Sequence, residues 1–127
     1  MLDGIHHAAI ICSDYEKSKH FYLSILGLEL IAENYREKRA SYKLDLRLPD
    51  GSQIELFSFK NPPVRPSYPE AQGLRHLAFS VSSIDATVAH LNSHGINTES
   101  IREDEYTGKR YTFFHDPDDL PLELYER

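Results

Sequence analysis

The feature of this sequence that most constrains its fold is an internal repeat. The segment His7–Glu55 recurs in outline as His76–Glu123, and each copy begins with a histidine and ends with a glutamate. The spacing from histidine to glutamate is the same in the two copies to within one position. Two modules that each supply one imidazole and one carboxylate can together provide four ligands for a divalent metal ion.

Both copies are predicted to contain a strand, a helix and three further strands. In the first copy, His7–Cys12 has the pattern of a strand, and Ser13 and Glu16 fit a capping box at the start of a helix. Gly27 stands where a left-handed helix cap is expected. The remaining strands are predicted at residues 29–35, 42–48 and 53–59.

The second copy repeats this order. A strand at 76–81 is followed by a helix that Ser82 or Ser83 caps and Gly95 ends, and then by strands at 97–102, 110–115 and 120–125. A proline-rich stretch joins the copies and resists both helix and strand. We therefore predict a single α+β domain over 1–127, with module one at about 4–60, a linker at about 61–73 and module two at about 74–127.

Strand parity places the four recurring residues on the faces that the helices leave open. Side chains alternate along a strand, so His7 and His76 point away from the apolar residues that must meet the helix. Glu55 and Glu123 each stand between two bulky apolar residues on a predicted central strand. A carboxylate in such a place is costly to bury unpaired, and a bound cation would remove that cost.

The less specific interpretations concern each residue alone. A single histidine on a strand is more often a hydrogen-bonded structural residue than a ligand, and a glutamate on a strand usually faces solvent. The matched recurrence of both favours the metal site. His6 is expected to be structural and to lie on the face opposite His7, because its counterpart in the second copy is Arg75. Surface or capping roles suffice for His20, His90, His94 and His115.

Composition narrows the class of partner. The chain has 127 residues, of which 40% are hydrophobic, and this is enough for one core without disulfides or structural metals. A net charge of −6 without a basic stripe argues against nucleic acid and anionic membranes, which leaves a small-molecule substrate. Cys12 is the only cysteine, and the N-terminus lacks a long apolar run, so a cytoplasmic protein is expected.

Four stretches of the sequence resemble one known family. They are IELF at 54–57, RPSYPEA at 65–71, GLRHLAF at 73–79, and YTGK at 106–109 leading to FFHDPD at 113–118. On these residues the chain resembles the vicinal oxygen chelate (VOC) superfamily, and within it the small bacterial glyoxalase I-like proteins. The resemblance implies the glyoxalase/bleomycin resistance/dioxygenase fold, a curved mixed sheet around a metal-binding cleft, and a homodimer.

The resemblance also implies a ligand set and a reaction. The family's ligand positions fall on His7, Glu55, His76 and Glu123, which would hold one divalent metal ion per site, nickel by preference, with zinc, cobalt or manganese as alternatives. Four ligands resemble glyoxalase I more than the thiol transferases and dioxygenases, which generally use two His and one Glu. The implied activity is that of a lyase or isomerase that moves a proton through a metal-bound enediolate, on a small α-hydroxycarbonyl or a thiol hemithioacetal. Glu123 is the first choice for the base, and Glu55 is the second.

Two positions depart from the glutathione-dependent pattern. Proteins of that kind commonly carry an Arg four residues after the first ligand His and an Asn four residues after the first ligand Glu, whereas this chain has Ile11 and Phe59. The sequence therefore does not specify which thiol or which substrate the protein would use. Two other classes also stay open: a non-catalytic antibiotic-binding module of the bleomycin-resistance kind, and a metal-dependent dioxygenase or thiol transferase. The residues with open-face parity, expected to line the substrate, are Ile11, Phe57, Phe59, Ser80 and Tyr125.

Overall fold

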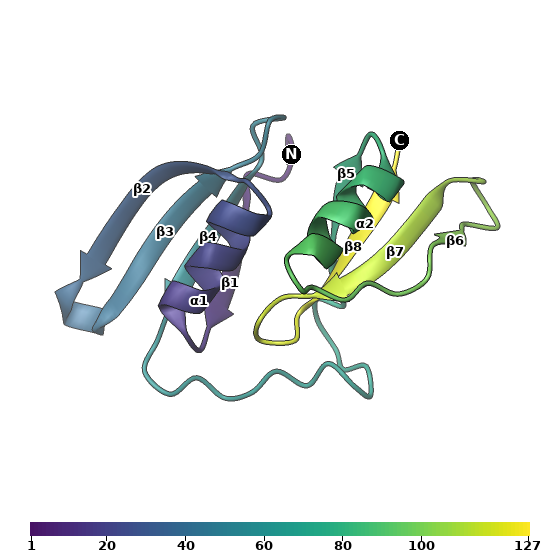
Figure 1. Ribbon diagram of the computed structural model, residues 1–127. Helices are drawn as coiled ribbons and strands as arrows, with labels where there is room; N and C mark the ends of the chain where they lie inside the picture. Colours follow the sequence, from purple (N-terminus) through teal and green to yellow (C-terminus); the bar gives the residue numbers. More distant parts are fainter. The chain divides into compact units, whose positions relative to one another are not determined.

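The computed structural model describes all residues, 1–127, and the chain divides into two compact units, Met1–Val64 and Arg65–Arg127. Each unit contains one four-stranded sheet, with the strand order β1-β4-β3-β2 in the first and β5-β8-β7-β6 in the second. In each sheet the first strand runs parallel to its neighbour, and the other pairs are antiparallel. The shared topology confirms the predicted repeat of a β-α-β-β-β module (Figure 1).

The first unit is built around one helical segment and its sheet. Its elements are β1 (His7–Cys12), α1 (Tyr15–Lys19), a π-helical continuation (His20–Ile25), β2 (Glu29–Arg36), a 3-10 turn (Glu37–Arg39), β3 (Ser41–Arg47) and β4 (Gln53–Ser58). The helix packs on one face of the sheet against β4 (Figure 1). Alternate residues of the central strands are buried under it, among them Leu44, Leu46, Ile54 and Leu56. The opposite face of these strands stays at least partly open.

The second unit repeats this plan with a longer helix and a shorter edge strand. Its elements are β5 (Leu77–Val81), α2 (Ile84–Ser93), β6 (Arg102–Glu103), β7 (Arg110–His115) and β8 (Pro121–Glu126). Helix α2 packs against β8 (Figure 1). The fully or almost fully buried core includes Ile84, Leu91, Phe114, Leu122 and Leu124. In each sheet the two residues that flank the proposed glutamate ligand are thus buried on the helix side.

The starts and ends of the helices test the capping predictions. The predicted capping box at Ser13 is wrong, because Asp14 is the N-cap of α1 and its carboxylate accepts a hydrogen bond from the Lys17 backbone N–H at 3.1 Å. A carboxylate at the N-cap also complements the positive end of the helix dipole. Ser83 caps α2, as one of the two predicted alternatives. Gly27 and Gly95 both adopt positive φ angles, which confirms the predicted left-handed cap at Gly27 and the predicted end of the second helix at Gly95.

The edge strand of the second unit is shorter than predicted. The sequence predicts a strand at residues 97–102, but the ladder with β7 contains only Arg102 and Glu103. The preceding residues still bond to β7 at one point, where the Glu99 N–H donates to the Phe113 carbonyl and Thr112 Oγ1 donates to the Glu99 carbonyl. Two such bonds replace a regular ladder, so residues 97–101 lie beside the sheet without strand geometry.

The connection between the modules has no regular structure, in agreement with the prediction from its prolines. No helix or strand occurs between Phe59 and His76. Across the whole chain, none of the helices has both the length and the apolar character needed to cross a lipid bilayer.

Removing the cap of α2 is expected to lower the stability of the second unit. Ser83 Oγ accepts a hydrogen bond from the Ala86 N–H at 3.2 Å. Ser83→Ala would leave that helix-end donor without its partner. We expect the free energy of unfolding to fall by about 1 kcal/mol. Urea titration measures this change, with Ser100→Ala as a control outside any helix. Equal stability of the two variants would show that the cap contributes nothing.

Candidate metal centre

The exposure pattern of β1 agrees with the predicted parity. Ile10 and Cys12 are buried, whereas His7 and Ile11 are exposed and Ala9 is exposed with them. On β4, Ile54 and Leu56 are buried and Glu55 between them is only partly exposed. The histidine and the glutamate of the first module therefore share the face of the sheet that does not carry the helix.

The pairing of β1 with β4 brings these two side chains together. The strands run parallel, with Ala9 opposite Glu55, so His7 precedes the directly facing residue by two positions on the same face. His7 Nε2 lies 3.4 Å from Glu55 Oε2, and 15% of the Glu55 side-chain surface is exposed. The first module thus forms an imidazole–carboxylate pair at the end of its sheet.

The second module forms the same pair at the equivalent register. Strand β5 runs parallel to β8 with Ala78 opposite Glu123, and His76 again stands two residues before the facing position. His76 Nε2 lies 2.9 Å from Glu123 Oε2, and 12% of the Glu123 side-chain surface is exposed. The repeat seen in the sequence is therefore a repeat of side-chain geometry and not only of element order.

Each pair offers two donors of the kinds that bind divalent metal ions. Neither unit by itself brings three His, Cys, Asp or Glu side chains into a metal-binding cluster. Each does supply one imidazole nitrogen and one carboxylate oxygen separated by 2.9 to 3.4 Å. Two adjacent ligands of one metal ion, each about 2.1 Å from it, lie about 3 Å apart. The donor types and their spacing thus match two neighbouring coordination positions in each module.

The two pairs differ in their electrostatic surroundings. In module one Asp45 lies directly opposite Glu55, and Lys43 Nζ lies 2.8 Å from the Asp45 carboxylate and 3.8 Å from that of Glu55. In module two Phe113 occupies the position opposite Glu123. Its ring meets the His76 ring edge-on, with centroids 5.0 Å apart. Glu55 therefore lies among charged groups, whereas Glu123 lies beside an aromatic ring.

The residue before each histidine contacts its second ring nitrogen. His6 Nδ1 lies 2.9 Å from His7 Nδ1, and an Arg75 guanidinium nitrogen lies 3.0 Å from His76 Nδ1. The expectation that His6 lies on the opposite face is therefore wrong, because His6 precedes β1 and strand alternation does not fix its direction. Sequence reasoning missed Arg75 as a neighbour of the site, although its place next to His76 was the available signal.

Aromatic side chains form much of the open face. Phe57 and Phe59 stack with centroids 5.9 Å apart in module one, and Tyr111 stacks on Tyr125 in module two. The Tyr125 hydroxyl donates to the Asp104 carboxylate at 2.9 Å. A hydrogen bond with Thr107 lowers the pKa of Tyr125, but burial and the Asp104 carboxylate outweigh it and raise that pKa above its usual value. Tyr125 thus stays protonated at neutral pH.

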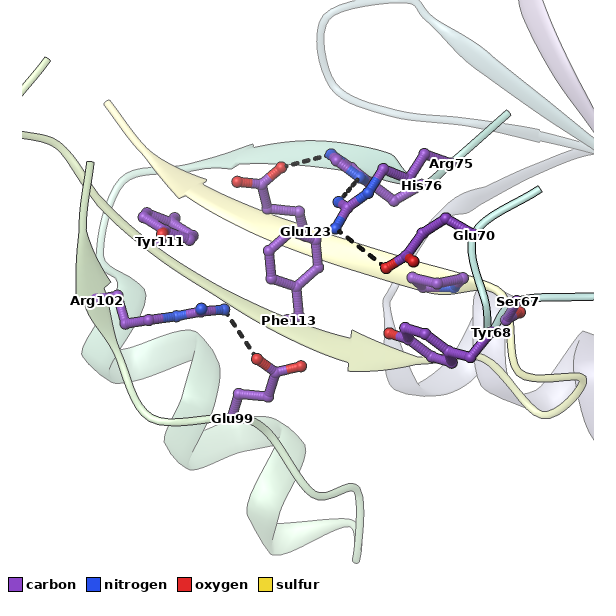
Figure 2. Close-up of a pocket in the computed structure, with 11 residues that line it drawn as sticks. Ser67, Tyr68, Glu70, Arg75, His76, Glu99, Arg102, Tyr111, Phe113 and Glu123 are labelled. Atoms are coloured by element: carbon purple, nitrogen blue, oxygen red, sulfur yellow. Dashed lines mark hydrogen bonds and ion pairs between the residues drawn. The ribbon is translucent and has the colours of Figure 1, made fainter. Parts of the chain in front are cut away.

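A cavity of about 390 Å³ opens beside the pair of the second module. Figure 2 shows His76 and Glu123 along one side of it, with Phe113 next to them. Arg75 and Arg102 also line the cavity, each close to a glutamate. Its volume is in the range of small-molecule sites, and a ligand bound there would lie against the proposed metal ligands.

The chain is thus an internally duplicated α+β protein, built from two β-α-β-β-β modules that each carry a His–Glu pair on the open face of their own sheet. Residues 4–124 match the Glyoxalase/Bleomycin resistance protein/Dioxygenase superfamily. The chain belongs to this superfamily, which confirms the resemblance noted from its sequence motifs.

The chain is also similar to individual known proteins. YwkD of Bacillus subtilis is 63% identical over 127 residues, which cover 100% of this chain and 99% of YwkD. A glyoxalase family protein from Enterococcus faecalis has a crystal structure that superposes with a TM-score of 0.90, at 52% identity and with 98% of each chain covered. The metallothiol transferase FosB of Staphylococcus saprophyticus is 28% identical, over 98% of this chain and 78% of FosB.

Proposed function

We propose that this protein is a divalent-metal-dependent, glyoxalase I-like lyase or isomerase, which moves a proton on a carbon next to a carbonyl group. Its substrate would be a small α-hydroxycarbonyl compound or a thiol hemithioacetal. The observation that carries the proposal is the pair of His–Glu contacts at the same register in both modules. Membership of a superfamily that includes a metallothiol transferase supports a metal-dependent reaction.

The proposed ligands of the metal are His7 and Glu55 from module one and His76 and Glu123 from module two. A module-one pair and a module-two pair would together bind a single ion through two imidazoles and two carboxylates. The two pairs would come either from one chain or from the two chains of a homodimer. This donor set suits nickel, and also zinc, cobalt or manganese. The bound ion would act as a Lewis acid that stabilises negative charge developing on the substrate oxygens.

Glu123 is the proposed base, and Glu55 is the alternative. Lys43 and Asp45 surround the Glu55 carboxylate and favour a fixed position for it. Glu123 has an aromatic ring opposite it and faces the cavity, so its carboxylate can approach a substrate carbon and take up the proton. When two carboxylates of one site lie in different surroundings, their proton affinities differ, and they commonly take different roles in acid–base catalysis.

A thiol transferase is the second candidate function, because FosB carries that name and resembles this chain over almost its whole length. The two reactions make different products from a thiol. A transferase joins the thiol covalently to its substrate, whereas the proposed enzyme rearranges an adduct that has already formed. Ile11 and Phe59 provide no charged group for the tail of glutathione, which favours another thiol or a thiol-free substrate in either case.

The test combines metal analysis with product analysis. We expect this protein, expressed in the cytoplasm and freshly purified, to contain one divalent ion per site. We also expect it to rearrange at least one adduct in a panel made with glutathione, bacillithiol and coenzyme A. Mass spectrometry distinguishes a rearranged adduct from a thiol transfer product. Metal-free protein that binds bleomycin without converting any adduct would instead indicate an antibiotic-binding module, and oxygen consumption with iron would indicate a dioxygenase.

A further inference from the structure

The cavity of the second module contains two arginines that the repeat does not explain. The register gives Arg102 opposite Tyr111 in module two and Asn34 opposite Lys43 in module one. The residue before the module-one histidine is likewise His6, where module two has Arg75. His–Glu pairs are common to both halves and suit a shared role. Module one also places an arginine over open-face rings, since Arg36 lies 4.8 Å from the Phe57 centroid and 5.8 Å from that of Phe59, but it stands at another register position, opposite Ser41. The positions of the two module-two arginines are therefore specific to that half, and such positions can select a substrate.

The guanidinium of Arg102 lies over the aromatic wall of the cavity. The centre of its guanidinium lies 5.1 Å from the centroid of the Tyr111 ring and 5.8 Å from that of Phe113. Stacking on aromatic faces orients a guanidinium and leaves the N–H groups at its edge able to bind an oxyanion. One of these nitrogens lies 2.8 Å from Glu99 (Figure 2). Both partners are close to half exposed, so the pair is weak and a ligand can exchange with it.

Arg75 lies on another side of the same cavity, next to the proposed metal ligand His76. Its nearest carboxylate, Glu70, is 4.0 Å away, which is too long for a hydrogen bond. Figure 2 shows the guanidinium of Arg75 close to both His76 and Glu70. More than half of each side chain of the Arg75–Glu70 pair is exposed, so this contact too contributes little.

We propose that this cavity binds an oxyanion group of the substrate, a carboxylate or a phosphate, through Arg102 and Arg75. The apolar body of the same molecule lies against Phe113 and Tyr111. The arginines supply charged donors suited to a planar carboxylate or a phosphate, and the aromatic rings supply the apolar wall. This inference rests on the proposed function, since it places the anionic end of the substrate in the cavity beside His76 and Glu123, the proposed metal ligands of module two.

The test compares an acid with its neutral ester. The probes are phenylpyruvate, its methyl ester and phenyl phosphate, titrated calorimetrically into the purified protein. We expect the acid to bind at least about 10-fold more tightly than the ester, because the ester lacks the charge-assisted hydrogen bonds. Tighter binding of phenyl phosphate than of phenylpyruvate would assign the oxyanion to a phosphate, and the reverse order to a carboxylate. Equal affinity for the acid and the ester, or for all three probes, would overturn the inference.

A variant of Arg102 then tests whether this arginine causes the preference for the acid over the ester. Arg102→Met keeps an apolar stem on the aromatic wall and removes the charge, so we expect it to weaken acid binding about 10-fold and to leave ester binding unchanged. Arg47→Met is the matched control, because Arg47 is a similarly exposed arginine paired with Glu29 on the first module. An equal loss for acid and ester in Arg102→Met, with unchanged circular dichroism, would contradict the proposal.

Metal content separates this inference from the proposed function. If wild-type protein contains the expected ion but does not prefer the acid, the oxyanion site is refuted while the metal-dependent function stands. If the protein lacks metal but prefers the acid through Arg102, the oxyanion site stands without the proposed reaction. Arg102→Met is expected to keep the wild-type metal content, since Arg102 contacts neither His76 nor Glu123 in the structure.

Discussion

His76→Ala is expected to abolish tight binding of a divalent metal ion. His76 supplies the only imidazole of the second module's pair, and its Nε2 lies 2.9 Å from Glu123 Oε2. Removal leaves a coordination position that alanine cannot fill and a largely buried carboxylate without its neighbour. We expect the affinity to fall by more than about 100-fold, the upper end for loss of a group that only supports a ligand. Competition titration with a chelating dye measures this affinity.

The matched control for this substitution is His94→Ala. His94 is an exposed residue of the same module that ends helix α2, so its removal changes the histidine count without touching the pair. Metal affinity should stay at the wild-type value. An equal fall in both variants would point to general loss of structure, and an unchanged affinity in His76→Ala would exclude His76 as a ligand.

Mixing two inactive variants shows which chains share a site. His7→Ala and His76→Ala are unfolded together and refolded as one sample. If each site takes its halves from two chains of a dimer, mixed dimers contain one intact set of ligands, and metal binding returns in part. If both halves come from one chain, the mixture stays inactive. Either result is compatible with the four ligands, and it decides how the modules combine.

Glu123→Gln is expected to lower the rate of proton transfer by about 10²- to 10⁴-fold, the usual contribution of a positioned acid–base group. Glutamine keeps the shape of the side chain but cannot accept the proton from carbon at neutral pH. The measurement is kcat on whichever adduct the wild-type protein converts, at saturating metal, together with exchange of the substrate C–H proton in deuterated water.

Glu55→Gln is the comparison that separates the two carboxylates. If Glu123 is the base and Glu55 only a ligand, excess metal should restore much of the activity of Glu55→Gln but not of Glu123→Gln. The opposite pattern would exchange the two roles and contradict the argument from the charged surroundings of Glu55. Restoration of both would mean that neither glutamate is the base.

The architecture of each module was predictable because local patterns agree with long-range pairing. Alternation along β1 and β4 and the glycines at 27 and 95 each specify their own conformation, and the structure confirms them. The errors occur where two local choices are nearly equivalent. Ser13 and Asp14 are adjacent candidates for the N-cap, and the chain uses the carboxylate. Likewise, β-branched residues near 97–101 indicate a strand, but backbone bonds at one point take the place of a ladder.

The details of the site were less predictable because they depend on register between strands. The recurrence of His and Glu indicated the two pairs, but the positions of Lys43, Asp45 and Phe113 opposite or near the glutamates follow only from the alignment of β3 with β4 and of β7 with β8. A slip of one residue would turn each of these side chains to the other face. The difference in charge between the two halves is therefore a property of the folded sheets.

The most direct test of the central claim is the number of divalent ions bound per chain, measured by elemental analysis of wild-type protein, His7→Ala and His76→Ala after loading and removal of excess metal. Two equivalent half-sites that together hold one ion predict one ion per chain in the wild type and none in either variant. Two ions per chain in the wild type, or a full complement of metal in either variant, would show that the His–Glu pairs do not form a single centre.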